Sequence, residues 1–195
     1  MSRNDIVIQN LSKAYGKTVV FSGLSCTFDA GKRYCLTAPS GAGKTTLFKI
    51  LLGLEKQDSG EITGLKGQRA GAVFQEDRLL EDYSALSNIR FVTGNQLSVS
   101  EINQYLLRLL PEDALQKPVR EFSGGMKRRL SVLRALLAPS DFLLMDEPFA
   151  GLDQETRLLT IRLIGELRKN RLLVVATHDP FDAELLDAVT FRLFD

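Results

Sequence analysis

The sequence of 195 residues contains no tryptophan, a single histidine and only two cysteines. Its 25 basic and 24 acidic residues nearly cancel and are mixed along the chain. A nucleic-acid-binding protein typically shows a basic stripe, so we expect no nucleic-acid partner. No stretch approaches the roughly 18 apolar residues of a membrane helix, and no apolar run of signal-peptide length follows the N-terminus. We therefore expect a soluble, cytoplasmic chain that reaches a membrane only by docking on other subunits.

The two cysteines, Cys26 and Cys35, lie in two expected strands that are joined by a turn over residues 29–32. Pairing residue 28 with residue 33 places the two cysteines opposite each other, which allows a disulfide. Structural disulfides are rare in a reducing cytosol, so we expect two buried free thiols. The spacing matches no zinc site.

The order of the expected elements indicates an α/β domain. β-rich runs lie at 5–10, 18–28, 33–38, 141–146 and 172–177, and a run with helical apolar spacing covers 44–54. Ser100 and Ser123 are candidate N-caps of two helices in the middle of the chain. Strands that alternate with helices predict a mainly parallel sheet covered on both faces. We expect one domain, with a core at about 1–77 and 139–195 and a helical subdomain at about 78–138.

The segment LTAPSGAGKTTL, residues 36–47, nearly matches the phosphate-binding pattern G-x-x-x-x-G-K-[ST]. An expected strand, a glycine-rich turn and an expected helix follow in the order that such a loop requires. The backbone N–H groups of the loop can then point into one nest at the positive end of the helix. The alternative is a turn with chance glycines. The expected nucleotide-binding residues of this segment are Ser40, Gly41, Ala42, Gly43, Lys44, Thr45 and Thr46, with Lys44 on the β- and γ-phosphates and Thr45 on Mg²⁺.

Ala38 stands where the pattern has its first glycine. It lies at the exit of the strand, before the part of the loop that wraps phosphate. A methyl group matters there only if the backbone needs a positive φ or if another group packs against that Cα. We predict a negative φ at Ala38 and a working loop.

A second candidate site follows the apolar run DFLLMD, which ends in Asp146 and is followed by Glu147. Ligands of open α/β sheets collect at the carboxyl ends of strands. Asp146 can hold Mg²⁺ there, directly or through water, and Glu147 can polarise an attacking water. An ordinary strand end with solvated acids is the alternative. Lys44 and Thr45 favour the first interpretation, because phosphoryl transfer to water needs a cationic cradle, Mg²⁺ and a water-orienting group together.

A third segment, Ser123-Gly124-Gly125, opens an expected helix whose free N–H groups suit an anion. A helix cap with no further role is the alternative. A second phosphate site has little use in a subunit that already has a phosphate loop. It becomes useful if another subunit supplies the nucleotide.

With these segments the chain resembles the ATP-binding subunit of ATP-binding cassette (ABC) transporters over essentially all of its length. The family's signature is usually L-S-G-G-Q, and FSGGM at 122–126 keeps its central Ser-Gly-Gly. APSGAGKTT is similar to the family's phosphate loop, FLLMDEP to its acidic strand, and AGLD at 150–153 to the loop that crosses the dimer interface. The resemblance implies a P-loop NTPase fold, with a mainly parallel sheet, a small antiparallel β part and a helical insertion subdomain.

The resemblance also implies roles for single residues. Gln75 matches the glutamine that binds Mg²⁺ and senses the transporter partner, and His178 matches the histidine that contacts the γ-phosphate. Tyr15 lies where the family has an aromatic ring that stacks on adenine, and Asp153 lies in the interface loop. Met126 replaces the usual glutamine of the signature and cannot donate a hydrogen bond, so we expect a weakened contact with the opposing nucleotide.

The resulting expectation is a Mg²⁺-dependent ATPase subunit at the inner face of the cell membrane. Two copies face each other head to tail, with each ATP between Lys44 of one copy and Ser123 of the other. Glu147, with Lys44 and His178, carries hydrolysis, and the cycle drives transmembrane permease subunits docked over the Gln75 region. The segment at 72–89 is similar to importers of the nitrate, sulfonate and taurine group, which favours import and adds an extracytoplasmic solute-binding protein.

Two alternatives stay open at this point. One is an ABC-type ATPase outside transport, although such relatives usually carry coiled coils, tandem cassettes or extra domains that this sequence does not show. The other is an ATP-binding module whose hydrolysis is impaired by Ala38 and Met126. Steady-state ATPase activity separates the second alternative from the main interpretation. The transported solute cannot be read from the sequence.

Overall fold

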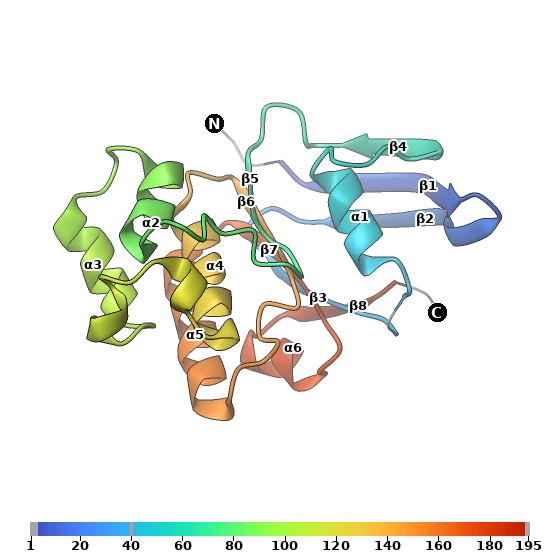
Figure 1. Cartoon of the computed structure of the whole chain (residues 1–195). Helices are drawn as coiled ribbons and strands as arrows, with labels where there is room; N and C mark the ends of the chain where they lie inside the picture. The colour runs from blue at the N-terminus through green and yellow to red at the C-terminus, as the bar shows by residue number, and fades with distance from the viewer. Residues whose placement is uncertain (1–3, 40, 194–195) are drawn as a thin grey trace. The chain divides into compact units, whose positions relative to one another are not determined.

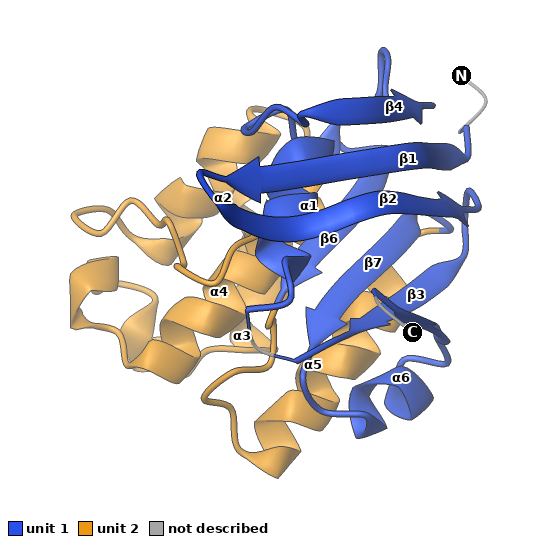
Figure 2. Ribbon diagram, turned by 90° about the vertical axis from the view of Figure 1, so that its right-hand side faces the viewer, with its two compact units in different colours: residues 1–70, 140–146, 170–195 blue, residues 71–139, 147–169 orange. Residues whose placement is uncertain are grey.

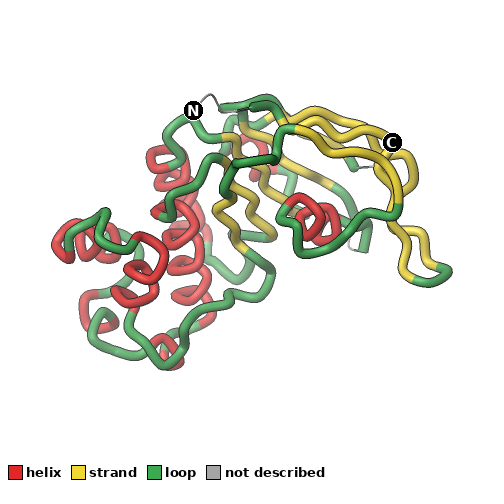
Figure 3. Tube along the Cα trace, turned by 90° about the horizontal axis from the view of Figure 1, so that it is seen from above, coloured by secondary structure: helices red, strands yellow, loops and turns green. Residues whose placement is uncertain are grey.

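The computed structural model describes residues 4–39 and 41–193, and the chain forms two compact units. Unit 1 comprises residues 1–70, 140–146 and 170–195, and unit 2 comprises residues 71–139 and 147–169. Figure 1 shows the order of the elements along the chain, and Figure 2 colours unit 1 blue and unit 2 orange. Strands dominate unit 1 and helices dominate unit 2, as the colours of Figure 3 show.

Unit 1 contains a small antiparallel sheet of strands β1 (Ile6–Tyr15), β2 (Thr18–Phe28) and β4 (Ser59–Thr63), in the order β2-β1-β4. β1 and β2 form a hairpin in which Tyr15 pairs with Thr18 and Ile6 pairs with Phe28. Gly16 in its two-residue turn has a φ of +59°, as tight hairpin turns require. β1 is longer than the run expected at 5–10, and it carries Tyr15 at its end.

The second sheet of unit 1 is parallel, and its strands β6 (Phe142–Asp146), β7 (Leu172–Thr177), β3 (Arg33–Thr37) and β8 (Val189–Arg192) are neighbours in that order. All residues of β6 and β7 are buried. Central strands of parallel sheets are covered on both faces, which explains why these two read as continuous apolar runs rather than as alternating ones.

Helices α1 (Lys44–Leu51) and α6 (Phe181–Leu185) pack against the parallel sheet of unit 1, α1 on β6 and α6 on β3. The apolar face of α1 joins residues of both sheets in one buried cluster. That cluster fixes the start of α1 and the loop before it. Its members are Ile6, Ile8, Leu11, Phe21, Phe28, Tyr34, Leu36, Leu47, Phe48, Ile50, Leu51, Phe142, Leu144, Leu172, Val174, Ala176 and Leu193.

Unit 2 is built on four α-helices: α2 (Ala85–Thr93), α3 (Val99–Leu107), α4 (Gly124–Leu137) and α5 (Gln154–Leu167). α4 packs against each of the other three helices. Two short 3-10 turns, η1 (Glu112–Ala114) and η2 (Val119–Glu121), connect α3 to α4. β5 (Ala70–Val73) begins at the last residue of the first segment of unit 1 and otherwise belongs to unit 2. The predicted α/β class with a mainly parallel and a small antiparallel sheet is confirmed.

Two local expectations are wrong. The N-cap of α3 is Ser98, not Ser100, because Ser98 and Glu101 form a reciprocal capping box that starts the helix two residues earlier. Cys26 and Cys35 do not face each other, because β2 pairs with β1 whereas β3 pairs with β7 and β8 in the other sheet. Neither cysteine forms a disulfide, as expected; Cys35 is buried, but Cys26 is only partly buried.

None of the described helices is long and apolar enough to span a membrane. The expected division into a core at about 1–77 and 139–195 and a helical subdomain at about 78–138 stays a prediction.

Candidate functional site

Three of the predicted segments follow the carboxyl ends of neighbouring strands in unit 1. In the parallel pairing Thr37 of β3 lies beside Thr177 of β7, and Asp146 of β6 lies beside Ala176. The glycine-rich loop therefore leaves β3 at the same edge of the sheet at which β6 ends in Asp146 and β7 leads to His178. This edge is where open parallel sheets bind ligands.

The glycine-rich loop needs its glycines. Gly41 and Gly43 have φ values of +80° and +88°, a backbone region that residues with a side chain rarely adopt. A Cβ at Gly43 would also lie 2.5 Å from Cγ1 of Val20, which belongs to the antiparallel sheet. Ala38 is not among the described residues with positive φ, so the predicted backbone angle is confirmed. Ser40, also assigned to this loop, lies outside the described residues.

The Lys44 side chain contacts the backbone of the glycine-rich loop. Its Nζ donates hydrogen bonds to the carbonyl oxygens of Ala38 at 2.6 Å and Pro39 at 3.2 Å, and the residue is 8% exposed. α1 begins at Lys44, and its N-cap, Gly43, has no side chain to occupy the first N–H groups. The first turn also holds no acidic residue. The helix start and the ammonium group together form a compact positive site for an anion.

Thr45 and Asp146 are brought into direct contact from positions 101 residues apart. The Thr45 hydroxyl donates a hydrogen bond of 2.6 Å to Oδ2 of Asp146, and Asp146 is 4% exposed. Hydroxyl and carboxylate oxygens are the donors that Mg²⁺ prefers, with the remaining positions taken by water and substrate phosphates. The donor set is compatible with a magnesium ion, and the metal site stays a prediction.

Tyr15 is supported by a network that sequence reasoning missed. Its hydroxyl donates to Oε2 of Glu55 at 3.2 Å, and Nζ of Lys13 lies 5.0 Å from the ring centroid. Lys13 is held by Glu55 at 2.9 Å and by Asp58 at 3.4 Å. The ring itself is 47% exposed, so it keeps surface for stacking. The available signal was that Lys13 and Tyr15 are two residues apart on one strand.

His178 is exposed at the turn that follows β7. Beside it, the Thr177 hydroxyl donates 2.6 Å to Oδ2 of Asp182, which is 1% exposed, and the Asp179 amide donates to the Thr177 hydroxyl at 3.2 Å. These bonds fix both neighbours of His178 in the chain. Asp182 is a supporting residue that the sequence did not single out.

Glu147 follows Asp146 directly and is the first residue of the second segment of unit 2. It is partly buried and has a φ of +49°. A left-handed backbone is costly for a residue with a side chain, and such strain is retained mostly at functional positions. The observation supports the catalytic assignment of Glu147.

Two further predicted segments lie side by side in unit 2. Ser123 caps α4 by accepting a hydrogen bond from the Met126 amide at 3.3 Å, and the first turn of α4 holds no acidic residue. A Cβ built on Gly125 would lie 3.6 Å from the carbonyl oxygen of Gly151. The signature segment therefore adjoins the loop at 150–153, so any larger residue at Gly125 faces that loop.

Asp153 at the end of this loop caps α5. Its carboxylate accepts hydrogen bonds of 2.9 Å from both the amide and the hydroxyl of Thr156, and these bonds lower the pKa of the carboxyl group. Gln75 lies in the irregular segment after β5 and is exposed. The site residues of unit 2 thus start helices or lie in loops.

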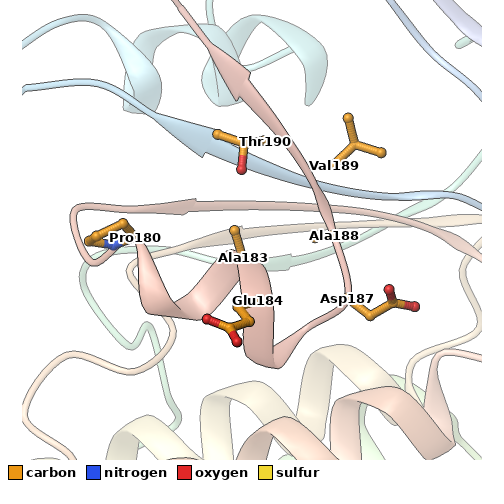
Figure 4. A pocket seen from close by; sticks show the side chains of 7 residues that line it. All are labelled: Pro180, Ala183, Glu184, Asp187, Ala188, Val189 and Thr190. Carbon is orange, nitrogen blue, oxygen red and sulfur yellow. The ribbon is translucent and has the colours of Figure 1, made fainter.

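A surface hollow of about 510 Å³ lies elsewhere in unit 1, between α6 and β8 (Figure 4). Its lining carries the carboxylates of Glu184 and Asp187 and no lysine or arginine, so it does not suit a phosphate group. None of the predicted site residues lines it. The lining residues are Pro180, Ala183, Glu184, Asp187, Ala188, Val189 and Thr190.

Comparisons with known proteins agree with this geometry. The profile of the family described as ABC transporter matches residues 21–150. The chain is 39% identical to the Nod factor export ATP-binding protein I of Burkholderia lata, in an alignment of 93% of this chain and 65% of that protein. It is 37% identical to the protein of the same name from Cupriavidus metallidurans, over 92% of this chain and 64% of that protein. The chain thus spans just under two thirds of the length of these relatives.

Solved structures share the fold. One described as the dimeric structure of a bacterial ABC transporter cassette superimposes with a TM-score of 0.81 at 24% identity, covering 96% of this chain and 94% of that one. A Pyrococcus furiosus protein described as an ABC transporter ATP-binding protein gives a TM-score of 0.82 at 22% identity, covering 97% of this chain and 98% of that one. At these identities the likeness concerns the fold alone.

Proposed function

This chain belongs to the ABC transporter family, and we propose that it is an ATP-binding subunit that couples Mg²⁺-dependent ATP hydrolysis to transport across a membrane. The observation that carries the proposal is the 2.6 Å contact between Thr45 and Asp146, at the edge where the glycine-rich loop leaves the sheet. This contact joins two motifs that are far apart in the sequence, at the position where a nucleotide's phosphates and metal meet.

In the proposed binding mode the loop at 38–46 wraps the phosphates and Tyr15 stacks on the adenine. Lys44 exchanges the carbonyl oxygens of Ala38 and Pro39 for β- and γ-phosphate oxygens. That exchange is favourable because phosphate oxygens carry negative charge, whereas the carbonyl oxygens are neutral, and a bond between two opposite charges is the stronger one. Thr45 and Asp146 would hold Mg²⁺, which would neutralise charge that develops on the phosphates, and the family resemblance adds Gln75 as a further ligand.

Glu147 is the proposed general base. Its carboxylate would orient and polarise the water that attacks the γ-phosphate, and His178 would donate a hydrogen bond to that phosphate. The strained backbone at Glu147 (φ +49°) supports a fixed direction for the carboxylate. Both neighbours of His178 in the chain are held by the Thr177–Asp182 hydrogen bond and the Asp179 amide.

We further propose that the complete site needs a second copy of the chain. Ser123, Gly124 and Gly125 present the start of α4 as an anion site, and one subunit has no need of two phosphate sites for one ATP. The γ-phosphate of an ATP bound at Lys44 of one copy would then contact Ser123 of the other. ATP would close this dimer, and hydrolysis would reopen it.

The proposed location is the inner face of the membrane, on permease subunits docked near Gln75. For the direction of transport, we propose export, because relatives named as export proteins align with 92–95% of this chain. Import, with an extracytoplasmic solute-binding protein, is the second candidate, favoured by the similarity of residues 72–89 to nitrate, sulfonate and taurine importers. Co-purification of the membrane partners distinguishes the two, since only an importer would bring such a binding protein.

The experiment that tests the ATPase compares the parent chain with Glu147→Gln. The variant keeps the shape of the side chain but loses the charge that favours proton transfer, so hydrolysis should fall by about a hundredfold or more. ATP and Mg²⁺ should still bind, and the uncleaved ATP should hold two copies together on a sizing column, which ADP should not do.

Three results would each contradict a part of the proposal. A parent without ATPase activity would favour the binding-only module. Near-parental hydrolysis by Glu147→Gln would remove its catalytic role and make His178 the next candidate. An active ATPase that co-purifies with no membrane protein would favour the alternative outside transport.

A further inference from the structure

Arg128 is a buried arginine to which the proposed mechanism gives no task. It lies in the second turn of α4, five residues after Ser123, and is 7% exposed. Its guanidinium group donates to the carbonyl oxygen of Phe74 at 2.6 Å from Nη1 and to that of Gln75 from Nη2. The side chain therefore holds the two peptide groups that flank the Cα of Gln75.

The guanidinium group is directed at these carbonyl groups more than at a charge partner. Nη1 lies 3.1 Å from Oδ1 of Asp77, yet that oxygen meets no donor in hydrogen-bonding geometry among the described residues. Burial raises the pKa of Asp77, although the nearby arginines and Lys127 oppose the shift. An arginine that served mainly as a countercharge would instead place its fork on the carboxylate.

The rest of the segment is fastened to the same helix. The carbonyl oxygen of Asp77 accepts from the Ser131 hydroxyl at 3.2 Å and from Arg134 at 3.3 Å, and Lys127 pairs with Glu81 at 2.7 Å. Residues 74–81 have no helix or strand of their own. Their backbone is thus ordered by side chains of α4, whose first turn is the signature segment.

We propose that Arg128 is a positioning residue that joins the Gln75 segment to the start of α4, so that the two move as one element. The inference rests on the proposed function, in which Gln75 serves the ATP of its own subunit and Ser123 serves the ATP of the opposite subunit. A shift of Gln75 on Mg²⁺ or partner binding then moves Ser123 as well. Arg128 thereby couples the two ATP sites of the dimer.

Arginine suits this task for a geometric reason. Its planar fork carries donors on two nitrogens and reaches two consecutive carbonyl groups at once, whereas lysine offers one point charge. A side chain without this fork would leave these partly buried carbonyl oxygens without their donor, which is costly. The segment would then take up other backbone conformations, and Gln75 would lose its fixed position.

The test compares the parent with Arg128→Gln, Arg128→Lys and a matched control, Arg120→Gln. Arg120 also lies in unit 2, but its guanidinium pairs with Asp82 at the surface. Four quantities are measured: the melting temperature, ATP affinity without Mg²⁺, kcat as a function of Mg²⁺ concentration, and amide hydrogen exchange at residues 75–78.

For Arg128→Gln we expect ATP affinity within about twofold of the parent. kcat should fall about tenfold, because misplacing a group by about 1 Å has costs of this order or more. The Mg²⁺ concentration for half-maximal activity should rise, and residues 75–78 should exchange faster. Arg128→Lys should lie between this variant and the parent, and Arg120→Gln should match the parent throughout. If Arg128→Gln does not fold, Arg128→Lys decides, with the same direction expected.

Two outcomes would overturn the inference: parental kcat and Mg²⁺ dependence in the folded Arg128 variants, or a loss of ATP affinity as large as the loss of kcat, which would make Arg128 a general structural residue. A parent that does not hydrolyse ATP would instead contradict the proposed function. Hydrogen exchange at residues 75–78 would still test the clamp in that case, and unchanged exchange would overturn it.

Discussion

The residues expected to handle ATP are held differently in the two units. In unit 1 those expected at the phosphates and the metal lie at or after the ends of parallel strands, and the sheet register sets their positions: Thr37 lies beside Thr177, and Asp146 beside Ala176. In unit 2 they start helices or lie in loops, as Ser123, Asp153 and Gln75 do. Parallel strands are fixed by pairing along their whole length, whereas a helix start leaves N–H groups without intrahelical partners.

This difference suggests a division of labour. In unit 1, Lys44 and Thr45 have partners within the same unit, and we propose that this half binds nucleotide by itself. The half in unit 2 presents the start of α4, and its ligand is proposed to arrive with a second copy. Changes at Lys44 in unit 1 should therefore affect ATP binding, and changes at Ser123 in unit 2 should affect dimer closure. The predictions below test that separation.

The largest effect is expected for Lys44→Ala in unit 1. Loss of the ammonium group should weaken ATP binding by about a hundredfold, because hydrogen bonds to charged groups contribute about 1.5–3 kcal/mol each. Calorimetric titration with ATP measures this loss. Lys49→Ala, in the last turn of the same helix, is the matched control and should bind like the parent. Equal losses in both variants would mean that the effect is one of net charge.

A smaller effect is expected for Ser123→Ala in unit 2, measured as ATP-dependent dimerisation in the Glu147→Gln background. Dimer affinity should fall about tenfold while ATP affinity of the monomer stays unchanged, since the proposed nucleotide contact of the hydroxyl is with the ATP of the opposing copy. Loss of the cap itself should lower stability by about 1 kcal/mol.

Ser98→Ala removes an equivalent cap from α3 and serves as the control. It should lose similar stability but keep the dimer. A weakened dimer in both variants would assign the effect to stability, and a lower ATP affinity in Ser123→Ala would break the separation between the two halves.

A change of about threefold is expected for Met126→Gln. A side-chain donor beside the opposing nucleotide adds about one net hydrogen bond, so ATP-dependent dimerisation should become tighter or ATPase activity should rise. Met126→Leu keeps the apolar character and should behave like the parent. If Met126→Gln changes neither quantity, the polarity of this position has no role.

The last prediction concerns the stability of the antiparallel sheet of unit 1 rather than the binding of nucleotide. Burial raises the pKa of the Cys26 thiol to about 11 from an ordinary value of 9.0. As the pH rises, the thiol therefore loses its proton in the unfolded chain before it does so in the folded chain. The free energy of unfolding falls as a result between pH 9 and 11. Urea unfolding should show that the parent loses more stability in this window than Cys26→Ala does. Parallel pH curves for the two proteins would contradict this prediction.

Much of the fold was readable from the sequence because its signals are local. The apolar runs at 142–146 and 172–177 read as buried strands, and the caps at Ser123 and Asp153 start helices as expected. The wrong cap of α3 was also a local matter. Ser98 and Glu101 have the Ser-x-x-Glu spacing of a capping box, which identifies Ser98 as the cap in place of the expected Ser100.

The supporting residues were not predictable in the same way. Arg128 reads as one cation in a run of three, and Lys13 as a charge beyond the strand expected at 5–10. Their roles depend on where residues 74–77 and Glu55 come to lie, and neither segment carries a periodic pattern that places it. No signal in the sequence distinguishes the buried Arg128 from the exposed Arg120.

The sequence by itself determined the order of the motifs and the chemistry that each can supply: a glycine-rich loop before a helix, an acid pair after an apolar strand, and a Ser-Gly-Gly helix start. Those properties depend on neighbouring residues, so a short window contains them. Only the tertiary structure decided that Thr45 touches Asp146, that Cys26 and Cys35 belong to different sheets, and that Arg128 holds the Gln75 backbone. These contacts follow from which apolar faces pack together, and packing couples residues that are far apart in the chain.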